Sequence, residues 1–331
     1  MAKARVYVAR QLPAEAIRRI KSSCDAAVWE RQGPSTRRVL LQRVKGIEGL
    51  LCTISEKVDA ELLDAAAPDL RVVSNLGVGF DNIDVPELTR RGIPLGNTPG
   101  VLTETTADLA FGLIIAASRR LVEGDRRVRA GKWRFWDITG FLGEDVHDAT
   151  IGIIGMGKIG TAVARRAKGF GMRVLYHDLV RRRDVEAELG AVFSSLEGLL
   201  SEADFVTIHA DLNQGTLHLI DAERIRLMKR NSILVNTARG TIVDNMALFK
   251  ALKARRIRGA ALDVTDPEPL PRDHPLLGLD NVLVTPHIGS ASVATRSKMA
   301  ELAVNNLLAG LEGKRLPHCV NPEVYVRNRL S

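Results

Sequence analysis

The chain has 331 residues, 45% of them hydrophobic and 26% charged, which is the composition of a globular protein long enough for two domains. The formal net charge is +8, but the basic residues are scattered along amphipathic segments, which argues against a nucleic-acid-binding protein. No apolar run approaches membrane-spanning length, and the N-terminal segment lacks the apolar stretch of a signal peptide, so we expect a cytoplasmic protein. Cys24, Cys52 and Cys319 have no metal-ligand spacing, and we expect no metal site.

The first hundred residues alternate between short β-rich runs and helical patterns. Strands are expected at 5–9, 49–54 and 71–77, and helices at 12–20 and 58–67. Such alternation predicts a parallel sheet covered by helices. The pattern from Thr103 to Lys132 predicts one long helix, which a Trp- and Gly-containing loop follows.

A second set of alternations begins at Ala149. Six strands are expected, at 149–155, 172–178, 204–210, 232–238, 257–264 and 281–286, which is what one doubly wound nucleotide-binding sheet requires. A final helix is expected at about 290–313, before a tail of packed irregular structure.

These patterns predict an α/β protein with two doubly wound parallel-sheet domains, of Rossmann-like or flavodoxin-like type. The substrate-binding domain would comprise residues 1–99 and 290–331, and a nucleotide-binding domain of residues 100–289, including the long helix, would be inserted between them. A cleft between the two domains is a common place for a ligand.

The sharpest local signal is a GxGxxG motif, residues 155–160, between an apolar strand and a helical pattern. Gly155 would allow the tight turn, Gly157 the approach of a pyrophosphate, and Gly160 close packing of helix on strand. The helix N-terminus, with Lys158 and Ile159, would present free N–H groups to the phosphates. The alternative is a tight turn that binds nothing.

Asp178 ends the next expected strand, eighteen residues after Gly160. An acid there can accept the ribose hydroxyls of NAD and would repel a 2′-phosphate, although it could also be a solvated strand end. Arg181, Arg182 and Arg183 follow at once and could bind that phosphate if the loop folds back. NAD is therefore the expected cofactor, with NADP as the alternative.

Three further charged side chains follow successive strands of the second set: Arg239, Glu268 and His287. In an open parallel sheet the carboxyl ends of the strands form the ligand-binding edge. Reduction of a 2-oxo acid needs a cation for the carboxylate, a proton donor at the carbonyl oxygen and a group that tunes the donor, and these residues supply one of each. Taken singly, each has an ordinary structural explanation as well.

At this point the chain resembles the D-isomer-specific 2-hydroxyacid dehydrogenases, most of all the glyoxylate/hydroxypyruvate reductases. The resemblance covers nearly the whole chain, in family order, through NLGVGFDNIDVPELTRRGIPLGNTPGVLTETTADLAFGL, GIIGMGKIG, NTARGTIVD, ALDVTDPEPL and TPHIGSAS. It implies reduction of a small 2-oxo acid to the D-2-hydroxy acid by hydride transfer, in a homodimer whose interface holds the long helix. Trp133 or Trp136 would reach the partner's active site or simply pack in the interface.

The resemblance also implies residue roles. His287 would be the general acid, Glu268 would stabilise its protonated ring, and Arg239, with the backbone of Val78 and Gly79, would bind the carboxylate. The remaining matched positions would contact the cofactor: Thr106, His209, Thr216, Thr237, Ala238, Asp263 and Gly289.

The chain departs from the family pattern at two places. Asp211 stands where the family usually has Pro, which weakens the assignment of the neighbouring His209 and Thr216. Asp178-Leu-Val stands where many NADP-using reductases carry Ser-Arg-Thr, which favours NAD. Two alternative functions remain: a phosphoglycerate dehydrogenase-like enzyme without a regulatory domain, and a dinucleotide-sensing corepressor, although the chain has almost no sequence beyond the two domains.

Overall fold

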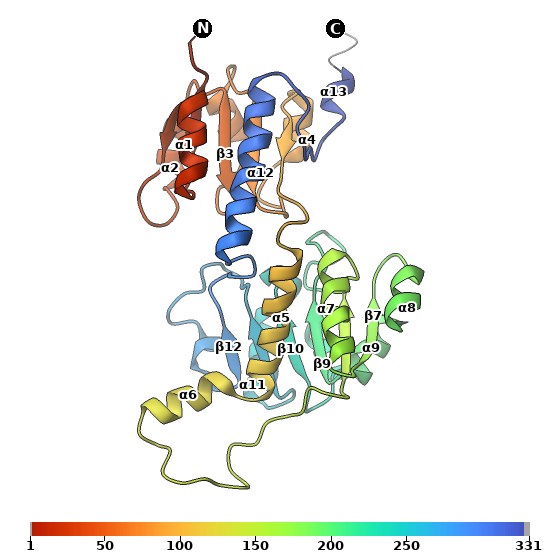
Figure 1. The fold of residues 1–331 in the computed structure, drawn as a ribbon. Helices are drawn as coiled ribbons and strands as arrows, with labels where there is room; N and C mark the ends of the chain where they lie inside the picture. Colours follow the sequence, from red (N-terminus) through yellow and green to blue (C-terminus); the bar gives the residue numbers. More distant parts are fainter. Residues whose placement is uncertain (1, 328–331) are drawn as a thin grey trace. The chain divides into compact units, whose positions relative to one another are not determined.

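The structure is a computed structural model that describes residues 2–327, and it divides into two compact units. The first comprises Met1–Leu102 and Ser292–Ser331, and the second, Thr103–Ala291, is a continuous insertion between those two segments. Both contain a wholly parallel sheet with helices on both faces, so the predicted pair of doubly wound domains is confirmed (Figure 1). Within residues 2–327, no helix has the length and apolar character needed to cross a membrane.

The first unit contains a five-stranded sheet in the order β2-β1-β3-β4-β5, the flavodoxin-like order. The strands are β1 (Arg5–Val8), β2 (Asp25–Val28), β3 (Gly49–Thr53), β4 (Val72–Leu76) and β5 (Leu95–Gly96). The helices are α1 (Ala14–Ser23), α2 (Arg37–Arg43), α3 (Ala60–Ala66), α4 (Val85–Arg90), α12 (Val293–Leu311) and α13 (Val324–Arg327). Alternate residues of β1 enter separate cores: Tyr7 packs with α2 and α3, and Val6 and Val8 with α1 and α12.

The second unit contains seven strands in the order β12-β11-β10-β9-β6-β7-β8. They are β6 (Thr150–Ile154), β7 (Arg173–His177), β8 (Val192–Phe193), β9 (Phe205–Ile208), β10 (Ile233–Asn236), β11 (Gly259–Leu262) and β12 (Val282–Val284). The helices are α5 (Thr103–Ser118), α6 (Leu121–Arg129), α7 (Lys158–Gly169), α8 (Arg183–Leu189), α9 (Leu196–Glu202), α10 (Ala222–Leu227) and α11 (Asn245–Lys253), with 3-10 turns at Gly240–Ile242 and Pro275–Gly278.

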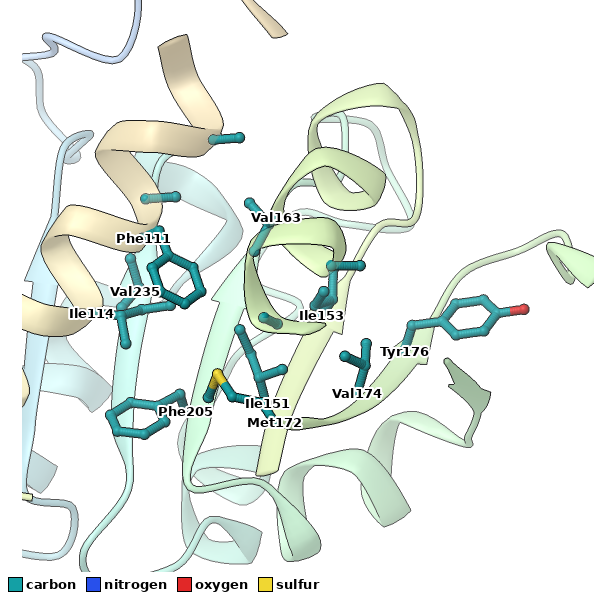
Figure 2. Packing of buried hydrophobic residues seen from close by; sticks show 14 of the residues in the cluster. Phe111, Ile114, Ile151, Ile153, Val163, Met172, Val174, Tyr176, Phe205 and Val235 are labelled. Atoms are coloured by element: carbon teal, nitrogen blue, oxygen red, sulfur yellow. The ribbon is translucent and has the colours of Figure 1, made fainter. Parts of the chain in front are cut away.

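Both faces of this second sheet are buried, which explains why its strands are almost continuously apolar. On one face, Ile151 and Ile153 of β6 pack with Phe111 and Ile114 of α5 and with Val163 of α7 (Figure 2). On the other, neighbouring positions of the same strands pack with α9, α10 and α11. Two cores thus fix the sheet, and with it the positions of the loops at its edge.

The element predictions differ from the structure in both units, and in the first unit β2 and β5 were not expected. The expected single helix from Thr103 to Lys132 ends at Ser118, because Arg120 takes a left-handed conformation with a φ of 53° and the carbonyl of Ser118 accepts the N–H of Glu144 instead. The second sheet has seven strands rather than six. The extra strand, β8, has only two residues, Val192 and Phe193, which is too short a run to predict a strand from the sequence.

Candidate active site

The candidate site lies along the carboxyl edge of the second sheet. Strands β6 and β9 are neighbours, and the chain leaves β6 towards β7 on one side and leaves β9 towards β10 on the other. Such a switch point is where parallel α/β sheets bind ligands. The loops that follow β6, β7, β9, β10, β11 and β12 carry nearly all of the predicted site residues of this unit.

The loop after β6 has the geometry of a dinucleotide cradle. Gly155 has a φ of +91°, a conformation that side-chain-bearing residues rarely adopt. A Cβ on Gly160 would lie 2.0 Å from the carbonyl oxygen of Gly155, whereas a Cβ on Gly157 would meet no atom within 4 Å. The loop is therefore tightly packed at Gly160, where α7 meets β6, and unobstructed at Gly157, where a pyrophosphate would approach.

Helix α7 begins at Lys158, with Gly157 as its N-cap. Gly157 and Lys158 are exposed, Ile159 is half-buried, and the first turn carries no acidic side chain. The free N–H groups and the positive end of the helix dipole therefore face solvent at the open side of the loop, which suits an anion. These residues fit the phosphates of a dinucleotide.

Asp178 joins the end of β7 to this loop. Its Oδ2 accepts the backbone N–H of Met156 at 2.6 Å, and its Oδ1 accepts that of Val180 at 3.3 Å. The carboxylate thus lies beside the glycine loop, where the sequence predicts the adenosine ribose.

His287 and Glu268 form a direct pair. The Nδ1 of His287 lies 2.5 Å from Oε1 of Glu268, and their side chains are 27% and 37% exposed. The ring is thus held by a carboxylate while still open to a ligand. The backbone of His287 has a φ of 52°, and its N–H donates to the carbonyls of Asp263 and Thr285. The strained conformation is fixed by strands β11 and β12, whose ends carry these two carbonyls.

Asp263, which is 1% exposed, organises the segment that carries the histidine. Its carboxylate accepts the Thr285 hydroxyl at 2.6 Å and the N–H groups of Ile288 and Gly289, each at 2.8 Å. The Thr106 hydroxyl of α5 donates to the carbonyl of Gly289 at 3.2 Å. Asp263, Gly289 and Thr106 therefore form one cluster that positions the backbone on both sides of His287.

Arg239 lies on the loop after β10, which packs against the loop carrying Glu268. A Cβ on Gly240 would lie 2.0 Å from the carbonyl oxygen of Thr265, so the two backbones are in close contact. The buried Asn236 side chain holds the turn by donating to the carbonyl of Arg239 and accepting the N–H of Ala238. The Arg239 guanidinium donates to the carbonyl of Ala238 at 2.8 Å.

His209, at the end of β9, has its ring enclosed between two threonines. Its Nε2 lies 2.9 Å from the hydroxyl of Thr207, and its Nδ1 lies 3.4 Å from that of Thr237. Burial lowers the pKa of His209 to about 3, so the ring is neutral at neutral pH. The backbone of His209 also packs against Gly155, which links this strand end to the glycine loop.

The remaining predicted residues are Thr216 and, in the first unit, Val78 and Gly79. Among residues 2–327, the Thr216 hydroxyl bonds only to the backbone of its own loop, at Asp211 and Asn213. Val78 and Gly79 belong to the first unit, where they follow β4. Their carbonyls accept the side-chain amides of Asn97 and Asn75, while their backbone N–H groups donate to no acceptor within residues 2–327.

The sequence reasoning missed three residues that build the site: Asn236, Gly240 and Thr285. Asn236 had a usable signal, because asparagine commonly bonds to its own backbone two residues on. Gly240 and Thr285 had none, because their roles depend on contacts between strands that only the folded sheet brings together.

A sequence model described as "D-isomer specific 2-hydroxyacid dehydrogenase, NAD binding domain" matches residues 111–289. A glyoxylate reductase of Korarchaeum cryptofilum is 52% identical over 97% of both chains. A glyoxylate reductase of Pyrococcus horikoshii is 48% identical, again over 97% of both chains.

Solved structures of similar proteins superimpose on almost the whole chain. A Thermus thermophilus protein superimposes with a TM-score of 0.90 at 47% identity, covering 96% of this chain and 99% of that one. An NADPH-dependent glyoxylate/hydroxypyruvate reductase of Sinorhizobium meliloti, in complex with NADP and malonate, has a TM-score of 0.83 at 31% identity and covers 98% of both chains. A D-lactate dehydrogenase of Aquifex aeolicus, complexed with NAD and lactic acid, has a TM-score of 0.85 at 29% identity. The match covers 96% of this chain and 99% of that one.

Proposed function

Because the chain belongs to the D-isomer specific 2-hydroxyacid dehydrogenase family, we propose that it reduces glyoxylate, or the related 2-oxo acid hydroxypyruvate, with NADH. Family membership makes it an NAD(P)-dependent oxidoreductase acting on CH–OH groups. The substrate is proposed from the similar reductases of Korarchaeum cryptofilum and Sinorhizobium meliloti. The observation that carries the proposal is the pairing of His287 with Glu268 at the carboxyl edge of the sheet.

The reaction converts a 2-oxo acid, NADH and a proton into a 2-hydroxy acid and NAD. When bound, the reduced nicotinamide supplies the hydride. His287 is the general acid: with Nδ1 engaged by Glu268, Nε2 is the ring nitrogen left to give a proton to the carbonyl oxygen. Glu268 fixes the orientation of the ring through the same contact.

The substrate carboxylate is proposed to bind two kinds of donor. Arg239 supplies a planar guanidinium that can meet two oxygens at once and can polarise the adjacent carbonyl. The backbone N–H groups of Val78 and Gly79, which have no acceptor within residues 2–327, supply neutral donors from the first unit. This is the basis for proposing substrate binding as the role of the first unit.

The second unit is proposed to bind NAD in preference to NADP, through three sets of residues. The glycine loop and the start of α7 would hold the pyrophosphate, and Asp178 would accept the ribose hydroxyls. The others would line the nicotinamide side or the rest of the cofactor: Thr106, His209, Thr216, Thr237, Ala238, Asp263 and Gly289. We propose a cytoplasmic location for the enzyme, where both small anionic ligands are available.

A homodimer is proposed from the family and from the apolar surface of residues 121–142, which we call the arm. Within it, Trp133, Phe135, Trp136 and Ile138 are between 68% and 78% exposed. Large aromatic side chains that are this exposed and this close together mark interaction surfaces. Further exposed apolar side chains of the arm are Leu121, Val128 and Leu142.

A substrate panel tests the proposal. The purified chain is given glyoxylate, hydroxypyruvate, pyruvate or phosphohydroxypyruvate with NADH or NADPH, and oxidation of the reduced cofactor is followed by absorbance. We expect the highest kcat/KM with glyoxylate or hydroxypyruvate and NADH. Preference for phosphohydroxypyruvate would favour a phosphoglycerate dehydrogenase-like enzyme. Dinucleotide binding without turnover on any acid would contradict the reductase and favour the corepressor class.

A further inference from the structure

The segment after β7 carries two opposed signals for the choice of cofactor. Asp178 lies beside the glycine loop, where an acid suits the free ribose hydroxyls of NAD. Arg181 and Arg182 follow within four residues and have the chemistry that binds a 2′-phosphate. Which signal prevails depends on what the two guanidinium groups already contact.

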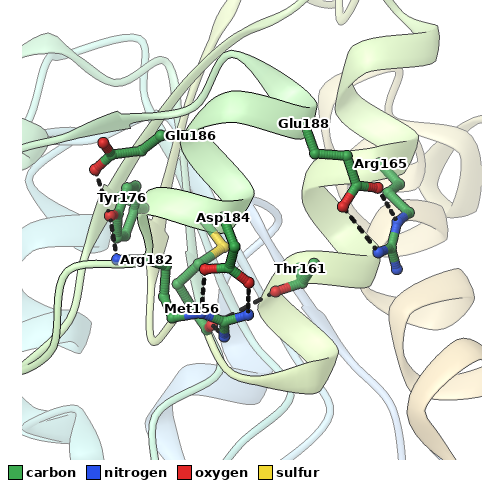
Figure 3. Close-up of polar contacts among 8 residues, drawn as sticks. All are labelled: Met156, Thr161, Arg165, Tyr176, Arg182, Asp184, Glu186 and Glu188. Atoms are coloured by element: carbon green, nitrogen blue, oxygen red, sulfur yellow. Dashed lines mark hydrogen bonds and ion pairs between the residues drawn. The ribbon is translucent and has the colours of Figure 1, made fainter.

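Arg182 contacts both Asp184 and the glycine loop (Figure 3). Its Nε and Nη2 donate to the two carboxylate oxygens of Asp184 at 2.9 and 2.7 Å. Its Nη1 donates to the carbonyl of Met156 in the glycine loop at 2.7 Å. All three guanidinium nitrogens therefore have an acceptor, and the side chain is bound to the loop as well as to α8.

Arg181 is held in the same bidentate way by Glu186. Its Nε and Nη2 donate to the two oxygens of that carboxylate at 2.8 and 3.0 Å. Glu186 is itself anchored, because it accepts the hydroxyl of Tyr176 of β7 at 2.7 Å, and this hydroxyl accepts the backbone N–H of Arg182 at 2.8 Å (Figure 3). The Tyr176 hydroxyl of β7 therefore contacts a member of each ion pair, Glu186 and Arg182.

Both carboxylates are ionised at neutral pH. The Arg182 guanidinium lowers the pKa of Asp184 to about 2, and Arg181 and the Tyr176 hydroxyl lower the pKa of Glu186. A single exposed ion pair is weak. Two bidentate pairs joined through a buried tyrosine form a network whose members hold one another in place, and an incoming phosphate would have to break it.

We propose that Asp184 and Glu186 are specificity-determining residues: by binding Arg182 and Arg181 they withhold two cations from the adenosine 2′ position, so that Asp178 selects NAD over NADP. This rests on the proposed function, in which the glycine loop binds the cofactor. In this arrangement the carboxylates of α8 act through the arginines and do not touch the cofactor. Arg181 and Arg182 therefore do not by themselves make this an NADP enzyme.

The test uses the full chain and two fragments that undergo no reaction, ADP-ribose and 2′-phospho-ADP-ribose, with dissociation constants measured by calorimetry. The variant Asp184→Asn/Glu186→Gln keeps the shapes of both side chains but removes the negative charges that hold the arginines. We expect the affinity for 2′-phospho-ADP-ribose relative to ADP-ribose to rise at least about tenfold. The dissociation constant of ADP-ribose itself should change less than about twofold.

Two matched variants separate release of the arginines from a simple change of charge. Glu188→Gln removes a carboxylate from the same helix, where it pairs with Arg165 at 3.1 Å, and should leave the ratio unchanged (Figure 3). Adding Arg181→Ala and Arg182→Ala to the double variant should abolish the gain in relative affinity for 2′-phospho-ADP-ribose. A gain that survives without the arginines, or a double variant with the wild-type ratio, would overturn the proposal.

Failure of this inference is distinguishable from failure of the proposed function. If the wild-type chain binds ADP-ribose and only the ratio is unaffected, the specificity role of Asp184 and Glu186 falls and the reductase stands. If the wild-type chain binds neither fragment, the cofactor site itself falls, and this inference falls with it. Should the double variant melt early, Asp184→Asn alone carries the test, because it leaves the Glu186–Tyr176 contact intact.

Discussion

At the scale of single residues, the site depends on one histidine held in an unusual backbone conformation. His287 takes a left-handed φ of 52°, which costs of the order of 1–3 kcal/mol for a residue with a side chain. Two carbonyl acceptors and the Asp263 cluster stabilise that conformation. This backbone conformation lowers the stability of the fold, and in it the ring contacts Glu268.

We predict that His287→Ala lowers kcat by about 10²–10⁴-fold, because the proposed proton donor is lost, while the dissociation constant of NADH changes less than about threefold. Stopped-flow turnover and fluorescence titration measure the two quantities. His147→Ala, at an exposed histidine of the same unit, is the control and should leave both unchanged. Equal losses of turnover and cofactor affinity in His287→Ala would mean that the residue is structural.

At the scale of elements, the junction of β6 and α7 sets how closely a cofactor can approach. Gly160 is buried against the carbonyl of Gly155, whereas Gly169, at the other end of the same helix, has open space around it. One helix therefore offers a matched pair of glycines, of which one is required by packing and the other is not.

Gly160→Ala is expected to lower the free energy of unfolding by about 1–3 kcal/mol and to weaken NADH binding at least about tenfold, because the new methyl group must displace the loop. Gly169→Ala should instead raise the free energy of unfolding by about 0.5–1 kcal/mol, because alanine has the higher helix propensity, and should not change NADH binding. Urea denaturation and calorimetry measure both. An unchanged NADH affinity in Gly160→Ala would argue against the glycine loop as the cofactor cradle.

At the scale of the whole molecule, the positive balance of the chain is consistent with two anionic ligands, since a net charge of +8 favours their encounter with the protein. The exposed apolar arm has a different consequence, because a second copy of the chain is the partner that the family resemblance implies for it.

Replacing Trp136 and Ile138 by Glu, at positions 78% and 72% exposed, should raise the dimer dissociation constant at least about 100-fold, because charges would be buried at the contact. Sedimentation velocity measures it. Val326→Glu, at a 60% exposed position outside the arm, should leave the dimer intact. A wild-type chain that sediments as a monomer would contradict the proposed homodimer.

The sequence by itself determined the alternation of strands and helices, the two parallel sheets and the glycine loop, because these follow from local periodicity and from backbone demands that few residues meet. It also put Arg239, Glu268 and His287 on successive strand ends, and parallel strands deliver such residues to one edge. Their family roles came from motif order rather than from spacing.

Only the tertiary structure decided the features that depend on contacts between distant segments. The break at Arg120 follows from the Glu144 N–H reaching the end of α5, and the orientation of His287 follows from Asp263, which lies 24 positions earlier in the chain. The arginines after β7 are the sharpest case. Their sequence is compatible with either cofactor, and only the folded positions of Asp184, Glu186 and Tyr176 show that the charges of Arg181 and Arg182 are already bound.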